Sequence, residues 1–454
     1  MKIIIEGAGE VGSHLAKMLS HEANEITVVD DDAARLSRLG STADVVTVLG
    51  DPCSLEVLKK AGAQKADLLV AVNPRVPQAV NIVSALLAKK LGTRQVTARV
   101  DDANYLQPEN KLIFKDMGID LMFYPEKIAT DEIMDLLKQS STTDAMAFGH
   151  GKLQLVVFKV DEDSPLLEMK LHEFTAAVSA RGEGTEFRVI AITRRDSTIM
   201  PKFDTHFKFQ DHIYIMSDRN GINDLMNFLG KGVVDIKNVM ILGATRIGAM
   251  LANRLYRHVD EIKLIDSDLE RCKELSASLP DPINVVCGDG RNSDFLIEES
   301  IKSFDAFVAV TGNDEENIMA CVVAKKFGIE RTIAEVENIE YIRLAEDMGV
   351  DAVINKKLIT AGRIFKFTLS DKVRFVKYMS GTDAEVLEYT VAPGCRITKG
   401  ALKDIDFPAN AIIGGVTRGS DAFIAVGSTR IEAYDRVAVF ALPEAVKEVD
   451  RWFK

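Results

Sequence analysis

The feature that most constrains the fold is an internal duplication. Several motifs in the first half of this 454-residue chain return in the second half, each displaced by nearly the same interval. The matching positions, first copy then second, are Gly7-Ala8-Gly9-Glu10-Val11-Gly12 and Gly243-Ala244-Thr245-Arg246-Ile247-Gly248, Asp30 and Asp266, Gly50-Asp51 and Gly288-Asp289, Asn81 and Asn317, Gly92 and Gly328, and Gly118-Ile119-Asp120 and Gly349-Val350-Asp351. A displacement held over so long a stretch is typical of duplicated domains, and the period is too long for a solenoid.

The segments that follow each copy also correspond, at a slightly shorter displacement that is again constant. Thr193-Arg194 matches Thr417-Arg418, and Asp211-His212-Ile213 matches Asp435-Arg436-Val437. The chain is therefore predicted to be a tandem repeat of a two-domain unit, an N-domain followed by a C-domain. The predicted boundaries are 1–124 for the first N-domain, 125–150 for a connecting helix, 151–231 for the first C-domain, 232–354 for the second N-domain, 355–380 for a second connecting helix and 381–454 for the second C-domain.

The N-domains have the pattern of alternating strands and helices. In the first copy, short apolar runs such as Lys2–Glu6, Glu25–Val29 and Ala66–Val72 are separated by segments of helical spacing such as Gln78–Lys90. Near-continuous apolar strands interleaved with helices indicate a parallel sheet covered on both faces. The C-domains carry short strands with turn residues and end in a helix-like tail. The predicted fold class is α/β: two Rossmann-like parallel-sheet N-domains, each followed by a small α+β C-domain of mixed strands.

The strongest chemical signal is a glycine-rich turn in the first N-domain. The motif GxGxxG follows the strand Lys2–Glu6 and opens a helix at Val11. Gly7 permits the tight turn, Gly9 lets the backbone approach a pyrophosphate, and Gly12 lets the helix pack close to the strand. The helix N-terminus adds unpaired N–H groups and a positive dipole for phosphates. Residues Ala8, Glu10 and Val11 complete the predicted loop of the site.

An acidic residue ends the next strand, at the spacing of a dinucleotide fingerprint. Asp30 follows Gly12 at that spacing and is predicted to accept both ribose hydroxyls of an adenosine. Asp31 and Asp32 follow it, and this anionic corner disfavours a 2′-phosphate. The pattern favours NAD(H) or another adenosine nucleotide over NADP(H). The alternative is a glycine turn that serves only helix–strand packing.

The second N-domain has a weaker form of the same signal. Thr245 replaces the second glycine, and its branched side chain is expected to crowd a pyrophosphate. Asp266 keeps the ribose position, and Gly243, Ala244, Ile247 and Gly248 complete the predicted loop. Arg246 takes the place of Glu10 and is expected to reach a terminal phosphate. The second site is thus predicted to hold a nucleotide differently or to be vestigial.

Further candidate residues follow the other predicted strands, since ligands bind at the carboxyl ends of strands in open α/β sheets. Those predicted for the first site are Asp51, Asn73, Pro74 and Arg99, and those for the second are Asp289, Thr311, Gly312 and Glu335. Arg99 is expected either to contact a phosphate or to pair with Asp102.

Composition and missing motifs narrow the function. The chain has 56 Lys and Arg against 68 Asp and Glu, so nucleic acid is not an expected partner. No apolar run approaches the roughly 20 residues that span a bilayer. The seven histidines form no evident pair with acidic residues, no catalytic or metal motif is present, and the five cysteines are predicted to be buried apolar residues of a reduced cytoplasmic protein. Two nucleotide-type sites without recognisable chemistry indicate a sensor rather than an enzyme.

The duplicated N–C–N–C order, with Gly7 to Gly12 and Asp30 in one copy and Gly243 to Gly248 and Asp266 in the other, resembles the TrkA family. These are regulatory subunits of bacterial and archaeal Trk potassium uptake systems, built from RCK (regulator of potassium conductance) units. The resemblance covers essentially the whole chain. It implies that the sites bind NAD(H) and ATP or ADP without catalysis, and that Arg246 directs ATP or ADP to the second site.

The resemblance also implies partners. It points to a TrkH- or TrkG-like potassium-translocating membrane protein, to a peripheral position on the inner face of the cell membrane, and to a homo-oligomer, plausibly a tetramer. One departure is the segment Asn73-Pro74-Arg75-Val76-Pro77, where the second copy keeps the family's Thr-x-x-Asp-Glu-x-Asn run. Three alternatives stay open: an NAD-dependent oxidoreductase with an atypical site, a nucleotide sensor of a different channel or transporter, and a scaffold with inactive sites.

Overall fold

The computed structural model describes residues 1–20, 24–73, 78–138, 144–148, 151–180, 186–195, 197–229, 235–365, 373–378 and 384–454. The described chain forms two compact units. The first contains residues 1–128 and the described part of 356–369, and the second contains residues 129–355 and the described part of 370–454.

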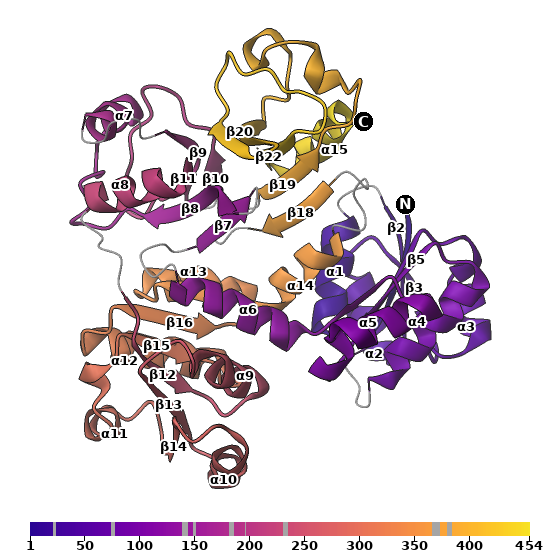
Figure 1. Cartoon of the computed structure of the whole chain (residues 1–454). Helices are drawn as coiled ribbons and strands as arrows, with labels where there is room; N and C mark the ends of the chain where they lie inside the picture. The colour runs from indigo at the N-terminus through magenta and orange to yellow at the C-terminus, as the bar shows by residue number, and fades with distance from the viewer. Residues whose placement is uncertain are drawn as a thin grey trace. The chain divides into compact units, whose positions relative to one another are not determined.

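The first N-domain is a six-stranded parallel sheet with helices on both faces (Figure 1). Its strands, in spatial order, are β3 (Val46–Leu49), β2 (Glu25–Asp30), β1 (Lys2–Glu6), β4 (Leu68–Ala71), β5 (Gln95–Arg99) and β6 (Leu121–Phe123). The helices are α1 (Glu10–Ser20), α2 (Ala33–Gly40), α3 (Leu55–Lys60), α4 (Ala79–Leu91) and α5 (Pro108–Met117). The order changes direction between β1 and β4, which is where ligands bind in doubly wound sheets.

The second N-domain repeats this topology. Its strands, in spatial order, are β14 (Ile283–Cys287), β13 (Glu261–Asp266), β12 (Asn238–Leu242), β15 (Ala306–Ala309), β16 (Arg331–Glu335) and β17 (Ala352–Ile354). Its helices are α9 (Arg246–Leu255), α10 (Leu269–Ser278), α11 (Ser293–Glu298), α12 (Asp314–Lys326) and α13 (Ile339–Asp347). All strand pairs of both N-domain sheets are parallel, as the buried apolar runs predicted.

Each C-domain contains a five-stranded antiparallel sheet rather than mixed strands. The first has β10 (Ser197–Ile199), β9 (Phe187–Arg194), β11 (His212–Asp218), β8 (Leu153–Lys159) and β7 (Asp144–Phe148), with α7 (Leu171–Ser179) and α8 (Arg219–Leu229). The second has β18 (Val373–Tyr378), β19 (Glu385–Thr390), β22 (Arg436–Ala441), β20 (Ala411–Arg418) and β21 (Asp421–Ile424), with α15 (Pro443–Trp452).

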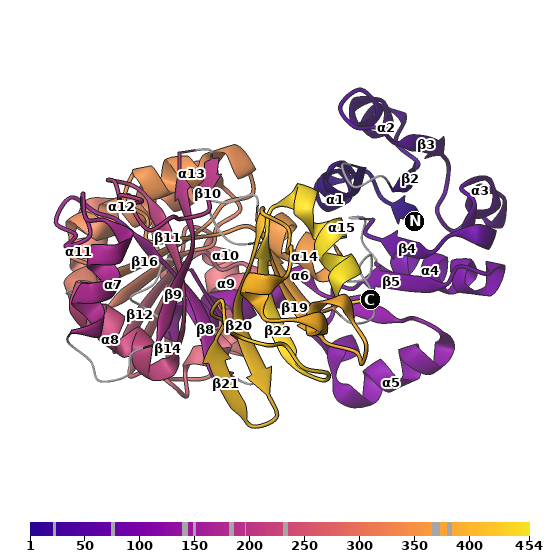
Figure 2. The same cartoon turned by 90° about the horizontal axis from the view of Figure 1, so that it is seen from above.

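The two C-domains pack against each other within the second unit (Figures 1 and 2). One buried cluster includes Leu155 and Tyr214 from the first C-domain and Val386 and Phe440 from the second. The Arg188 guanidinium donates to the carbonyl oxygen of Ile413, at 3.2 Å, across this contact. The duplicated C-domains therefore share part of one apolar core.

The connecting stretches hold helices and strands. The expectation of helix over 125–150 and 355–380 is wrong for β7 and β18, which add edge strands to the C-domain sheets. The helices themselves are α6 (Pro125–Lys138) and α14 (Lys356–Phe365). Most of α6 belongs to the second unit, where Leu136 accepts a hydrogen bond from Arg331 of β16. Helix α14 belongs to the first unit and packs on α1. Each helix therefore packs on the N-domain of the other copy.

Candidate functional site

The glycine-rich loop of the first N-domain is fixed by contacts too close for side chains. Gly7 has φ of +105°, and a Cβ there would lie 2.7 Å from the Cα of Asn73. A Cβ on Gly12 would lie 1.8 Å from the carbonyl oxygen of Gly7. The tight turn predicted for Gly7 and the close helix packing predicted for Gly12 are both confirmed. Helix α1 begins at Glu10, so its N-terminus lies at the carboxyl end of β1.

Asp30 has a structural role that the sequence analysis missed. One of its carboxylate oxygens accepts a hydrogen bond from the amide of Ala8 at 2.6 Å, and the other accepts from the amide of Asp32 at 2.8 Å. The side chain is 1% exposed, and Arg35 lies 3.9 Å from it. Asp30 therefore joins the end of β2 to the glycine loop. Each carboxylate oxygen can accept a second bond, so the ribose role predicted for Asp30 is compatible with this one.

The second N-domain has the same geometry. Gly243 has φ of +117°, and a Cβ on Gly248 would lie 2.0 Å from the carbonyl oxygen of Gly243. The Asp266 carboxylate accepts from the amide of Ala244 at 2.6 Å and from that of Asp268 at 2.8 Å. The loop is thus held in the same way in both copies.

The Thr245 side chain is fixed in this loop by two hydrogen bonds. Its hydroxyl donates to the carbonyl oxygen of Val310 at 2.8 Å and accepts from the amide of Gly248 at 3.3 Å, which caps α9. These bonds hold the side chain against the end of β15. Arg246 is the first residue of α9 and is exposed.

Glu10, at the matching place in the first copy, has a partner far along the chain. Its carboxylate lies 3.0 Å from the Nζ of Lys357, at the start of α14. The Lys357 side chain is 15% exposed and that of Glu10 is 65% exposed. Proximity of Lys357 also contributes, after burial, to lowering the pKa of His14 on α1. No sequence pattern indicated that a lysine from the second half of the chain would reach this loop.

Two buried asparagines connect the ends of neighbouring strands. Asn81 accepts from the amide of Asn73 at 2.9 Å and donates to the carbonyl oxygens of Asn73 and Arg99 at 3.1 and 3.2 Å. Asn317 accepts from the amide of Thr311 at 2.9 Å and donates to the carbonyl oxygen of Glu335 at 2.8 Å. The recurrence of Asn81 as Asn317 was the sequence signal for this clamp.

Arg99 does not pair with Asp102, which was one of the two alternatives predicted for it. The Arg99 guanidinium donates to Glu126 of α6 at 3.3 Å, and both side chains are largely buried. Asp102 instead accepts from the amide of Asn104. Glu335, the corresponding strand-end residue of the second copy, is buried.

The remaining candidates also lie at the carboxyl ends of the strands. The exposed Asp51 accepts from the amide of Cys53, whereas Asp289 pairs with the guanidinium of Arg291, whose hydrogen bonds lower the Asp289 pKa. A Cβ on Gly312 would meet no atom within 4 Å, so the space beside it is open. Pro74 lies outside the described residues.

A buried carboxyl immediately precedes the first glycine-rich loop. Glu6, the last residue of β1, is 0% exposed, and its pKa is raised to about 8. Burial is the main cause, the nearby Ser84 hydroxyl opposes it, and the charge of Asp51 adds to it. Leu242 occupies the matching position at the end of β12, so the second loop is preceded by an apolar side chain and not by a carboxyl.

Within the described residues, no three His, Cys, Asp or Glu side chains are grouped so as to hold a metal ion. Nor does any described helix combine the length and apolarity needed to cross a membrane.

Sequence profiles cover both copies of both domains. The TrkA-N domain matches residues 3–125 and 239–356, and the TrkA-C domain matches residues 155–230 and 386–454. The chain belongs to the TrkA family. Its fold, two Rossmann-like domains each followed by a C-domain, is the one that the resemblance implied.

Relatives of the same length support this assignment. The chain is 32% identical over 457 residues to the Trk system potassium uptake protein TrkA homolog of Archaeoglobus fulgidus, with 100% of both chains covered. It is also 32% identical over 460 residues to the Trk system potassium uptake protein TrkA of Halomonas elongata, covering 100% of this chain and 99% of that one.

Solved structures show the same fold at lower identity. The RCK domain of GsuK aligns with a TM-score of 0.59 at 18% identity, over 100% of this chain and 94% of the other. The GsuK channel bound to NAD aligns with the same TM-score and identity, over 100% of this chain and 78% of the other. GsuK bound to ADP aligns with a TM-score of 0.50 at 15% identity, over 80% and 68%.

Proposed function

We propose that this chain is the nucleotide-binding regulatory subunit of a potassium uptake system. The single observation that carries the proposal is the paired loop geometry: in both N-domains a strand-end aspartate accepts a hydrogen bond, at 2.6 Å, from the amide that follows the first glycine of the turn. Full-length similarity to Trk system potassium uptake proteins supplies the transport context. The chain acts by binding and changing conformation, not by catalysis.

The first N-domain binds NAD(H) in this proposal. The phosphates lie at the N-terminus of α1, over Gly7 to Gly12, and the ribose hydroxyls bond to Asp30. The run Asp30-Asp31-Asp32 disfavours a 2′-phosphate. Glu10 at the first turn of α1 disfavours a terminal phosphate. Binding of NAD to GsuK, which shares the fold, supports this choice.

The second N-domain binds ATP or ADP in this proposal. Arg246 is exposed at the first turn of α9 and carries the charge that a terminal phosphate requires. Asp266 receives the ribose, and the open space beside Gly312 leaves room for the ligand. Binding of ADP to GsuK supports an adenine nucleotide here.

The proposed membrane partner and oligomeric state rest on membership of the TrkA family. The chain docks on the inner face of a TrkH- or TrkG-like membrane subunit as a peripheral cytoplasmic protein, and the RCK units of four chains form a ring. Ligand binding that favours one ring conformation over the other by about 1–3 kcal/mol per site is sufficient to change channel opening.

The test is calorimetric titration of the full chain with NADH, NAD⁺, ATP and ADP. Asp30→Asn and Asp266→Asn remove the charge and keep an acceptor for the loop amide. Each is expected to weaken one ligand class by about tenfold or more. Asp32→Asn and Asp268→Asn are the matched controls, because asparagine caps a helix as well as aspartate does. Absence of binding to all four nucleotides by the wild-type chain would overturn the proposal.

The proposed regulation of potassium uptake needs a separate measurement. Potassium flux through proteoliposomes that contain a Trk-type membrane subunit is recorded with and without this chain, at fixed nucleotide concentration. The expected result is a flux that depends on the chain and on the nucleotide. An unchanged flux would overturn the regulatory role and leave nucleotide binding standing.

A further inference from the structure

Two cysteines of the second N-domain meet beside the proposed nucleotide site. Cys272 lies on α10, and Cys287 is the last residue of β14, the strand against which α10 packs. The Cys272 sulfur lies 3.4 Å from the carbonyl oxygen of Asp266, and the Cys287 sulfur lies 3.8 Å from that of Ser267. Asp266 and Ser267 are consecutive, so both thiols lie against the same short segment.

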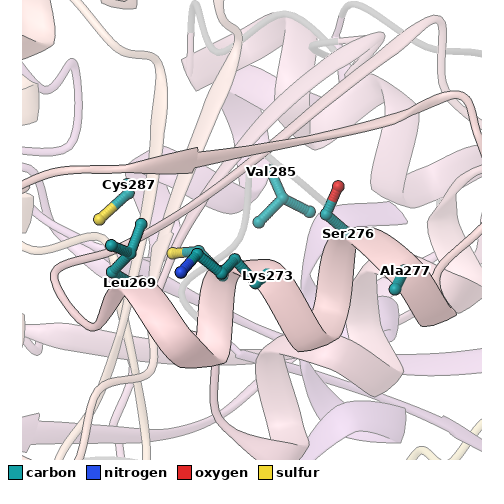
Figure 3. Close-up of a pocket in the computed structure, with 7 residues that line it drawn as sticks. Leu269, Lys273, Ser276, Ala277, Val285 and Cys287 are labelled. Atoms are coloured by element: carbon teal, nitrogen blue, oxygen red, sulfur yellow. The ribbon is translucent and has the colours of Figure 1, made fainter.

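Oxidants can reach one of the two thiols from solvent. Cys287 is exposed, whereas Cys272 is 5% exposed. This corrects the sequence-based view that all five cysteines are buried. A pocket of about 410 Å³ opens at this place, and Figure 3 shows Cys287 at one end of it, near Leu269 and Lys273 of α10. An attacking and a resolving thiol of a redox pair differ in exposure in this way.

The first N-domain has the same positions without the sulfur. Leu36 and Leu49 stand where the second copy has Cys272 and Cys287, on the displacements that relate Asp30 to Asp266 and Gly50 to Gly288. Leu36 is 4% exposed and Leu49 is 56% exposed, so the pattern of one buried and one exposed side chain is the same. Apolar side chains therefore satisfy the packing at both positions, and packing alone does not require a thiol at either.

We propose that Cys272 and Cys287 form a redox-responsive thiol pair, which a hydroperoxide closes into a disulfide at the edge of the second nucleotide site. The Cys287 thiolate attacks the O–O bond, so an S–O bond forms and water or an alcohol leaves. The Cys272 sulfur then attacks the resulting sulfenic acid, an S–S bond forms, and a second water leaves with the Cys272 proton. Two thiols are oxidised and one hydroperoxide is reduced.

The order of the steps follows from the environments. Burial raises the pKa of Cys272 to about 11, with further contributions from Cys287 and Asp266, so this thiol stays protonated at neutral pH. Cys287 is exposed, so it meets the hydroperoxide first, and Cys272 resolves the intermediate. A reducing dithiol reverses the reaction.

The disulfide would tie the end of β14 to α10, next to Asp266 and immediately before Gly288-Asp289. The consequence for ligand binding rests on the proposed function: oxidation changes nucleotide affinity at the second site and leaves the first site unchanged. The first site therefore serves as an internal control, because Leu36 and Leu49 occupy the positions that match Cys272 and Cys287.

Disulfide formation is tested without any nucleotide. The full chain is treated with hydrogen peroxide, digested without reduction, and examined by mass spectrometry. The expected product is one cross-linked pair of peptides that contains Cys272 and Cys287, lighter by two hydrogen atoms and separated by dithiothreitol. Cys287→Ser and Cys272→Leu, which copies the first domain, abolish it, and Cys53→Ser does not. A sulfinic acid at Cys287, with Cys272 still a free thiol, would overturn the proposal.

The link to the nucleotide is a separate measurement. ATP, ADP and NADH are titrated into oxidised and reduced protein, with Cys287→Ser as control. The expected result is a change of about fivefold or more in the affinity that Asp266→Asn removes, with none in the affinity that Asp30→Asn removes. A disulfide with unchanged affinity overturns the coupling. Absence of any nucleotide binding overturns the proposed function, while the thiol result stands by itself.

Discussion

The two N-domains hold their glycine loops by the same contacts and surround them with different charges. The Asp30 and Asp266 carboxylates each accept two backbone amides at matching distances, and Asn81 and Asn317 each connect two strand ends. The contacts that hold the backbone have therefore been retained by both copies after duplication.

The groups that differ lie on or under the loops. The first copy has Glu6 beneath its loop and Glu10 paired with Lys357, whereas the second has Leu242 and Arg246 at the two matching places. A duplicated scaffold can change its ligand preference through such positions without disturbing the turn, because none of the four side chains makes the loop-holding bonds.

The largest effect is expected from Gly12→Ala and Gly248→Ala. Either methyl group would lie 2.0 Å or less from a carbonyl oxygen of the loop, so backbone must move. We expect each N-domain to lose at least about 3 kcal/mol of stability. Gly312→Ala is the control, because its methyl group enters open space. Thermal unfolding of the three variants measures the difference, and equal melting temperatures would refute the shared loop geometry.

Glu6→Leu is expected to give a smaller, pH-dependent effect. The raised pKa means that folded Glu6 binds its proton more tightly than unfolded Glu6, so its contribution favours folding most below pH 4.5 and is lost progressively up to about pH 8. Stability should therefore fall as the pH rises through this window. Glu6→Leu, which copies Leu242, should remove that slope.

The control for Glu6 is Glu25→Gln, at an exposed carboxyl on the neighbouring strand. Denaturant unfolding at pH 5, 6 and 7 gives the slopes. If wild type and Glu6→Leu lose stability equally over this range, Glu6 is not the group that titrates.

Asn81→Ala and Asn317→Ala come next. Each removes a buried side chain that satisfies backbone groups of two strands, so about 2 kcal/mol of stability should be lost in either domain. Asn284→Ala, on the exposed side of β14, should change stability by less than about 0.5 kcal/mol. Denaturant unfolding compares them, and a large loss in one domain alone would show that the clamp is not shared.

The smallest effect on stability is expected from Glu10→Arg. The ion pair with Lys357 is half exposed to solvent and contributes about 0.5 kcal/mol or less. Under the proposed function, however, the first site should gain about tenfold in affinity for ATP. Arg246→Glu is the reciprocal variant and should lower the affinity of the second site for ATP. Calorimetry measures the nucleotide affinities of both variants. If each site keeps its wild-type preference, this position does not select the ligand.

Much of the fold could be predicted because its signals are local. Apolar runs such as Lys2–Glu6 and the glycine spacing after them require only neighbouring residues, and the duplication is visible in the printed sequence. Of the two alternatives predicted for Arg99, pairing with Asp102 was wrong, because Asp102 is near in sequence but Glu126 is near in space. The edge strands β7 and β18 were missed because pairing with a distant strand, not local propensity, makes those segments strands.

The sequence by itself determined the four-domain repeat, the parallel order of the N-domain sheets and the position of both glycine turns. Those properties depend on period, spacing and the absence of a Cβ. Tertiary structure decided that Asp30 and Asp266 hold the loops, that Lys357 reaches Glu10, and that Cys272 and Cys287 lie against the same segment. These contacts join residues that belong to different strands and helices, and only the packing of those elements brings such pairs together.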